Sequence, residues 1–256
     1  MGRNAIRYLS IAGFIGLWLV VALINERVQF INPALFPSPI DIAVAGYDLR
    51  GYLVTDVAIS LFRSLLGFLI AAVAGVFLGC LCASFRTVGA IIDPILDLIR
   101  PIPPLAFLPI FIIWFGLGEL SKILMIAFSS FFIIYVNTYQ GVRYADPVLV
   151  RAAQSMGASR RQIFQTITLP AALPEIITGL RLGMGMSFFV LVAAELIAAD
   201  SGMGFRIQEA RWQFRVDRMF YGAALIGIVG FILFALLRKI EARLLRWKPQ
   251  IEQSRM

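Results

Sequence analysis

Histidine is absent from the 256-residue sequence, and Asp, Glu, Lys and Arg together make up only 15% of it. The lack of histidine removes the most common metal ligand and proton shuttle of proteins. The sequence also lacks the Gly-x-x-x-x-Gly-Lys-Ser/Thr loop that binds nucleotide phosphates and the Gly-x-Ser-x-Gly motif of serine hydrolases. We therefore do not expect an enzyme, and any ATP-driven step would require an ATPase on another chain.

The shortage of charge is matched by an excess of apolar residues, which make up 60% of the chain and give a mean hydropathy of +0.85. A soluble domain, by contrast, is about one quarter charged. Several apolar runs reach the roughly 20 residues that a helix needs to cross a bilayer core. None of them shows the alternating pattern of a transmembrane strand. The composition thus predicts an all-α, polytopic membrane protein.

Cysteine is also scarce, and both cysteines, Cys80 and Cys82, lie in one apolar run. Two residues apart on a helix, their side chains point in divergent directions, so we expect buried thiols rather than a disulfide. The same run contains Gly75 and Gly79, a spacing that permits close approach of a second helix.

We expect about six transmembrane helices and treat residues 1–256 as one transmembrane domain. The first helix is expected to stay uncleaved, because Asn25 and Glu26 follow it rather than a small-residue cleavage motif. The polar connections are expected to carry a short surface helix at 40–49 and an amphipathic segment at 205–214. The expected spans cover residues 9–24, 59–85, 88–117, 123–142, 176–199 and 220–237.

The third of these regions is interrupted by Arg100, Pro101, Pro103 and Pro104. Proline removes a backbone donor and breaks or kinks a helix. Broken backbone at membrane depth is tolerated only where protein buries it or where it lines a cavity. The region is therefore either one kinked span or a helix, a bend and a half-span. We favour a cavity wall over a simple packing kink.

A polar stretch, residues 144–174, separates the fourth and fifth expected spans. Asp146 is placed to cap a first short helix, and Gly157 suits the left-handed residue that ends it. Ser159 and Gln162 have the spacing of a capping box that starts a second helix. We interpret the stretch as a cytoplasmic docking element of two helices through which another protein acts.

The net charge of +8 indicates an orientation in the membrane. Placing both termini and residues 144–174 in the cytoplasm puts most Lys and Arg residues on that side, as the positive-inside rule requires. The connection 200–218 is an exception, with four arginines and three acids. Either it is tucked into the protein or its charge has a use. The basic residues form no single patch with interleaved aromatics, which argues against nucleic-acid binding.

Four ionisable residues, Arg63, Arg100, Arg181 and Glu195, lie within the expected spans. A charge at the membrane centre costs about 2.5–3.5 kcal/mol on insertion scales, so each is a candidate functional residue. Structural roles are open too, and we give them precedence. Arg63 and Arg181 would snorkel to the membrane surfaces. Arg100 would pair with Asp97, and Glu195 with an arginine of another helix.

The stretch Arg151-Ala152-Ala153, with Gly157 and then Leu169-Pro170, resembles the EAA loop of binding-protein-dependent ABC importer permeases. Arg151 stands where the general pattern has Glu, which is similar to the taurine branch. Other segments resemble the taurine, alkanesulfonate, nitrate and bicarbonate permeases, and the taurine permease most. These segments are 36–39, 93–94, 100–106, 108–109, 114–118, 169–174, 179–181 and 194–199.

This resemblance implies a type I ABC importer permease fold in a bacterial inner membrane, surrounded by lipid. It implies three kinds of partner: a second copy of the permease, two cytoplasmic ABC ATPases, and a periplasmic or lipid-anchored substrate-binding protein. ATP and Mg²⁺ would be held by the ATPases, so we expect no cofactor in this chain. The implied coupling residues are Arg151, Ala152, Ala153, Gly157, Arg160, Leu169 and Pro170. The candidates for the translocation path are Arg63, Arg100, Pro103, Pro104, Arg181 and Glu195.

The implied substrate is a small organic anion such as taurine or another alkanesulfonate. Nitrate, bicarbonate or an aromatic carboxylate are alternatives within the same machine. A secondary transporter is a more remote alternative, and it would predict inverted repeats that we do not see. A membrane-embedded enzyme is disfavoured because the acids form no clustered catalytic motif.

Overall fold

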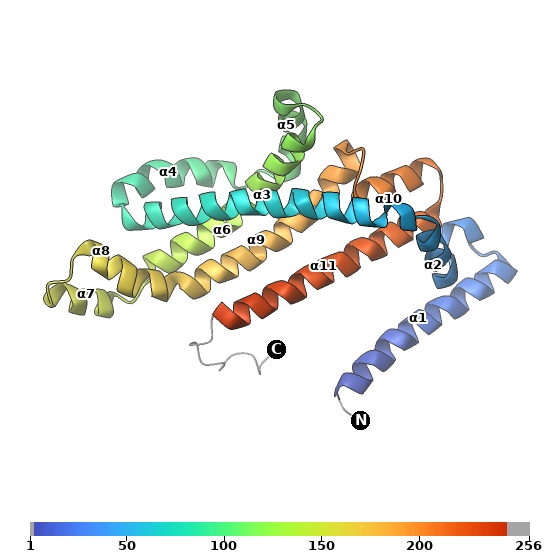
Figure 1. The fold of residues 1–256 in the computed structure, drawn as a ribbon, viewed down its shortest axis with the longest axis horizontal. Helices are drawn as coiled ribbons and strands as arrows, with labels where there is room; N and C mark the ends of the chain where they lie inside the picture. Colours follow the sequence, from blue (N-terminus) through green and yellow to red (C-terminus); the bar gives the residue numbers. More distant parts are fainter. Residues whose placement is uncertain (1–2, 245–256) are drawn as a thin grey trace. The chain divides into compact units, whose positions relative to one another are not determined.

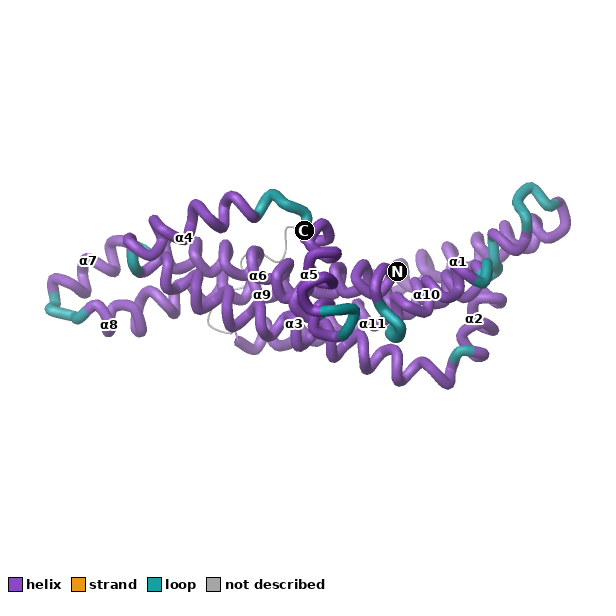
Figure 2. Tube along the Cα trace, turned by 90° about the horizontal axis from the view of Figure 1, so that it is seen from above, coloured by secondary structure: helices purple, strands orange, loops and turns teal. Residues whose placement is uncertain are grey.

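A computed structural model describes residues 3–244, and every regular element in that range is helical, as Figure 1 shows. Figure 2 traces the same helices and the short loops that join them. The all-α prediction is therefore confirmed. The chain divides into two compact units, residues 1–60 with 195–229 and residues 61–194 with 230–256. The unit boundaries fall inside α3 (Arg50–Ser84), α9 (Leu169–Ala198) and α11 (Val216–Leu244).

The first unit contains α1 (Arg3–Val28), the short turn η1 (Pro33–Leu35), α2 (Pro39–Asp48) and α10 (Met203–Trp212). A capping box starts α2: the Ser38 N–H donates to the Asp41 carboxylate at 2.8 Å, and the Asp41 N–H donates to the Ser38 hydroxyl at 3.2 Å. The helices predicted at 40–49 and 205–214 are thus α2 and α10. The predicted amphipathic pattern of α10 is wrong, because Arg206 and Glu209 are paired inside the unit and only Arg211 is exposed.

The second unit contains most of the predicted spans and the polar stretch between them. Its core is α6, which has buried residues along most of its length. Besides the central parts of α3 and α9, its elements are α4 (Arg86–Ile99), η2 (Pro104–Phe107), α5 (Leu108–Phe115), α6 (Glu119–Arg143), α7 (Pro147–Ser155), α8 (Arg160–Ile163) and the π-turn η3 (Phe164–Thr168).

Among the described residues, four helical stretches are long and apolar enough to cross a membrane. A fifth is present if the bent pair α4 and α5 counts as one span. The predicted span 9–24 falls within α1, and part of it lies outside the residues whose side chains are described. The four stretches are Arg50–Ser84, Glu119–Arg143, Arg160–Trp212 and Val216–Arg243.

The proline-rich region is sharply bent rather than gently kinked. α4 and the following Pro104–Phe115 segment meet at 87°. Pro103 immediately precedes the 3-10 turn η2, and Pro104 begins it. Pro94, by contrast, is accommodated inside α4. Of the two alternatives left open by the sequence, the structure has a helix, a bend and a second short helix.

Glycines let α3 and α9 pack closely on either side of α6. A Cβ atom on Gly79 of α3 would lie 2.8 Å from Thr138 and 3.0 Å from the Tyr135 carbonyl oxygen. A Cβ atom on Gly183 of α9 would lie 2.6 Å from Ile134, which is fully buried. The close approach predicted from the Gly75 and Gly79 spacing is therefore confirmed.

Candidate functional site

The polar stretch forms two short helices with the caps that the sequence predicts. The Asp146 carboxylate accepts a hydrogen bond from the Val148 N–H at 2.8 Å, which fixes the start of α7. Gly157 has φ +81° directly after α7, a conformation that favours glycine. The Ser159 N–H then donates to the Gln162 side chain at 2.8 Å and the Gln162 N–H donates to the Ser159 hydroxyl at 3.3 Å. Both caps and the glycine turn are confirmed.

The second short helix runs without a break into the fifth predicted span. α8 is a single turn, followed by the π-turn η3 and then by α9, which begins at Leu169. The π-turn ends two residues before Pro170, which has no N–H to donate and whose ring crowds the carbonyl four residues earlier. Pro174 was predicted to help mark the start of the span, but it lies inside α9. The Leu169 boundary is confirmed, and the π-turn was not foreseen.

α7 presents an apolar face to its surroundings. Val148, Leu149 and Met156 have exposed fractions of 61%, 52% and 81%. Ala152 is exposed as well. Residues 148, 152 and 156 are spaced by four and therefore lie on one helical face. Ala153 points the other way and is buried within the chain. The sequence-based prediction gave Ala152 and Ala153 as contact residues and missed the larger apolar residues. The spacing of four between 148, 152 and 156 is a signal that could have identified this face.

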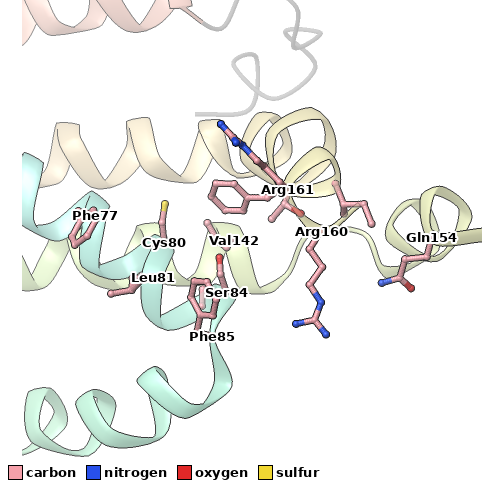
Figure 3. A pocket seen from close by; sticks show the side chains of 13 residues that line it. Phe77, Cys80, Leu81, Ser84, Phe85, Val142, Gln154, Arg160 and Arg161 are labelled. Atoms are coloured by element: carbon pink, nitrogen blue, oxygen red, sulfur yellow. The ribbon is translucent and has the colours of Figure 1, made fainter. Parts of the chain in front are cut away.

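Within residues 3–244, the arginines of this stretch form no ion pair with an acid. Arg151 donates from Nε to the Pro147 carbonyl oxygen at 3.2 Å. Arg160 and Arg161 are exposed and form no ion pair within residues 3–244. Figure 3 shows their side chains extending in different directions from α8. The stretch thus offers a partner both an apolar face and free positive charge.

Arg63 is a buried residue rather than a surface one. Its side chain is 0% exposed, and its Nε donates to Glu119 Oε2 at 2.5 Å. Lys122, also buried, donates to Glu119 Oε1 at 3.2 Å. The expectation that Arg63 snorkels to the membrane surface is wrong, because α6 supplies a carboxylate that neutralises it in place.

Arg100 and Arg181 both have acidic partners. Arg100 Nη2 lies 3.0 Å from Asp97 Oδ1, so the predicted local pair is confirmed. Arg181 Nη1 lies 3.3 Å from Glu241 Oε2 and joins α9 to α11 instead of merely snorkelling.

Arg100 also lines a polar cavity of about 280 Å³ between α4 and α6. Tyr135 donates a hydrogen bond to Asp93 in the cavity wall. Tyr139, Gln140 and Tyr144 line it as well. The structure therefore places Arg100 beside a cavity, whereas Pro103 and Pro104 form the adjoining bend.

Glu195 is fully buried at the N-terminus of α10. It accepts hydrogen bonds from the Ser60 hydroxyl at 2.7 Å and from the Gly204 N–H at 2.9 Å. Ser60 in turn accepts from the Met203 N–H at 2.9 Å. A carboxylate is favoured at this end of a helix, because its free N–H groups carry partial positive charge. The arrangement anchors α10 to the rest of the first unit.

Two of the four arginines in the basic connection 200–218 are paired with acids of its own unit. Arg206 Nε lies 2.6 Å from Asp56 Oδ2, and a second nitrogen lies 2.8 Å from Glu209. Arg215 pairs with Asp217 at 2.7 Å, and this hydrogen bond raises the pKa of Arg215. The first alternative raised by the charge of the connection thus holds for the part around Arg206, whereas residues 211–215 are exposed. Within residues 3–244, no three Cys, Asp or Glu side chains are grouped as a metal site requires.

Residues 75–246 match the protein family described as the binding-protein-dependent transport system inner membrane component. The chain belongs to this family. It is 40% identical over 250 residues to the taurine transport system permease protein TauC of Escherichia coli (strain K12), which covers 95% of this chain and 90% of that protein. It is 35% identical over 243 residues to the putative aliphatic sulfonates transport permease protein SsuC of Bacillus subtilis (strain 168), covering 94% of this chain and 87% of that one.

A third family relative is named for a different compound. The formylaminopyrimidine transport permease protein ThiX of Halalkalibacterium halodurans is 31% identical over 220 residues, covering 86% of this chain and 88% of that protein. Among solved structures, the MetNI methionine ABC transporter in an inward-facing conformation matches with a TM-score of 0.64 at 20% identity. It covers 78% of this chain and 97% of that chain. The chain is thus the transmembrane subunit of an ABC importer, an inner-membrane component with the type I fold.

Proposed function

We propose that two copies of this chain form the translocation path of an importer for taurine or another small alkanesulfonate. The observation that carries the proposal is the identity of 40% to a taurine permease over almost the whole of both chains. The sulfonate permease of Bacillus subtilis supports the same substrate class. A sulfonate is a compact anion that a guanidinium holds with two hydrogen bonds, as it does a carboxylate or phosphate.

The 144–174 stretch would bind a cytoplasmic ABC ATPase, which holds ATP and Mg²⁺. ATP hydrolysis by that ATPase would drive transport through this contact. The exposed face formed by Val148, Leu149, Ala152 and Met156 has the character of a helix that lies in an apolar groove. Arg151 and Arg160 would pair with acids on the groove rim. Both termini would then lie in the cytoplasm.

Movement of the ATPases would reach the membrane through the short helices. Buried Ala153 holds α7 against the chain, and Gly157 fixes the turn between α7 and α8. α8 continues through the π-turn into α9, so Leu169 and Pro170 lie where the cytoplasmic element meets the span. A displacement of α7 would therefore be passed directly to α9.

Within the membrane, we assign different roles to the four ionisable residues on the basis of their contacts. Arg63, Arg181 and Glu195 hold elements of the fold together. Arg100 lines a cavity beside the bend at Pro103 and Pro104, so it is our candidate for transient contact with the anion. A periplasmic or lipid-anchored binding protein would deliver the substrate and supply most of the selectivity.

Reconstitution into liposomes tests the proposal. The chain, its cognate ATPase and its binding protein should accumulate labelled taurine only with ATP, and vanadate should stop the uptake. An excess of ethanesulfonate should compete, whereas nitrate, bicarbonate and benzoate should not. Competition by one of the latter would reassign the substrate. Uptake driven by an ion gradient without ATP would instead show a secondary transporter.

A further inference from the structure

The second unit contains a cavity of about 850 Å³ next to the docking element. Its volume falls in the range of about 300–1,000 Å³ that is typical of small-molecule sites. Its walls come from the last turns of α3, the end of α6 and the α8–η3 segment, as Figure 3 shows. Arg160 and the α8–η3 segment also take part in the importer cycle proposed above, whereas the lining residues of α3 and α6 have no role in it.

The cavity changes character along its length. One end is apolar, with Phe77 and Leu81 of α3, and Phe85 and Val142 lie further along the wall. The other end carries the exposed side chains of Arg160 and Arg161. Phe77 and Leu81 lie inside the candidate span Arg50–Ser84, whereas Arg160 and Arg161 stand at the very start of the candidate span Arg160–Trp212.

We propose that this cavity binds an anionic glycerophospholipid, with an acyl chain along Phe77 and Leu81 and the phosphate beside Arg160 and Arg161. Basic pockets between transmembrane helices at the cytoplasmic surface suit acidic lipid headgroups. Arg160 and Arg161 both line the cavity, and their side chains extend in different directions from α8. Neither has an ion-pair partner within residues 3–244, so a lipid phosphate would compensate charge that these residues do not.

Depth distinguishes a lipid from a soluble partner. Phe77 is 67% exposed and lies about two turns inside the span. A cytoplasmic protein that binds the arginines does not reach it, whereas an acyl chain does. Phe164 and Thr168 of the π-turn also line the cavity. A bound lipid therefore contacts the segment that joins α8 to α9.

Cys80 provides a probe inside the cavity. It lines the wall and is partly exposed, whereas Cys82 is buried, and no other cysteine occurs in the sequence. The full chain carrying Cys82→Ala, in nanodiscs of phosphatidylcholine with or without phosphatidylglycerol, is labelled with N-ethylmaleimide. We expect phosphatidylglycerol to slow labelling about tenfold, in keeping with the attraction of a few basic residues for an anionic lipid. Unchanged labelling would overturn the proposal.

Three further experiments test whether a bound lipid is what protects Cys80 from N-ethylmaleimide. Arg160→Gln with Arg161→Gln should abolish it, and the matched pair Arg86→Gln with Arg143→Gln, exposed but outside the cavity, should not. Leu81→Trp, which fills the apolar end and keeps the charge, should also weaken lipid retention measured by native mass spectrometry. Protection by inorganic phosphate, by added ATPase or by a second copy of the chain instead of lipid would overturn the proposal. The inference rests on the cytoplasmic placement of residues 144–174, and no arm measures transport, so its failure is distinct from failure of the proposed function.

Discussion

Arg63 of α3 and Glu119 of α6 form a two-point ion pair, with Nε–Oε2 and Nη2–Oε1 distances of 2.5 and 2.6 Å. The arginine is fully buried, whereas the Glu119 side chain is 47% exposed. Lys122 shares the same carboxylate. One carboxylate therefore contacts two buried cations where α3 meets α6.

Removing this carboxylate should destabilise the fold. In Glu119→Gln, Arg63 and Lys122 stay buried but lose the Glu119 carboxylate. Loss of one partner of a fully buried pair costs about 3–5 kcal/mol. Because Glu119 is half exposed, we expect about 1–3 kcal/mol, with partial rescue in Glu119→Asp. Denaturant unfolding of the purified chain in detergent measures the change. The control is Glu241→Gln, which breaks the more exposed pair with Arg181 and should cost below about 1 kcal/mol. Equal losses in both variants would contradict the account.

The contact of α3 with α6 should tolerate no methyl group at Gly79. Its Cβ would meet the Tyr135 carbonyl oxygen at 3.0 Å, and backbone cannot move aside as a flexible side chain does. We expect Gly79→Ala to cost about 1–3 kcal/mol of stability, as overpacking does. Gly227 of α11 has open space around it within the described residues, so Gly227→Ala should be neutral or gain up to about 1 kcal/mol. Thermal unfolding of the two variants side by side makes the comparison, and a Gly79→Ala variant as stable as Gly227→Ala would refute it.

The turn between α7 and α8 should depend on backbone conformation alone. A Cβ atom on Gly157 would meet nothing within 4 Å, but φ there is +81°. We expect Gly157→Ala to cost about 1–2 kcal/mol, and Gly157→Asn less, because asparagine adopts this conformation more readily. Hydrogen exchange at the α7 amides reports the local effect. Equal exchange in the Ala and Asn variants would show that the positive φ does not limit this turn.

Local features of the sequence predict this part of the fold well. The Asp146 cap, the Gly157 turn and the Ser159–Gln162 box each depend on residues within four positions of one another. The ion pair of Arg63 does not, because its partner is 56 residues away in the chain. Arg206 and Asp56 are 150 residues apart, so the partner of Arg206 could not be predicted from the sequence either.

The prolines show where the local sequence no longer predicts the backbone conformation. Pro94 and Pro174 lie inside helices, whereas Pro103 and Pro104 accompany an 87° bend. The same residue type thus either stays within a helix or ends one, and packing decides between the two. The exposed face of α7 is a different case, since its spacing was visible in the sequence and only the direction of burial was unknown.

The central claim is that the outward face of α7 couples this chain to an ATPase. Leu149→Glu with Met156→Glu places two charges on that face without touching the caps or buried Ala153. Gln165→Glu, exposed in the π-turn, is a control that adds negative charge nearby. We expect both proteins to insert and fold alike.

The deciding measurement is co-purification of the ATPase together with substrate-stimulated ATP hydrolysis in proteoliposomes. The α7 double variant should lose the ATPase during purification and reduce stimulated hydrolysis at least about tenfold, since buried apolar anchors of an interface each contribute about 1–2 kcal/mol or more. The Gln165→Glu control should retain both. Retention of ATPase and of stimulated hydrolysis by the double variant would contradict the account.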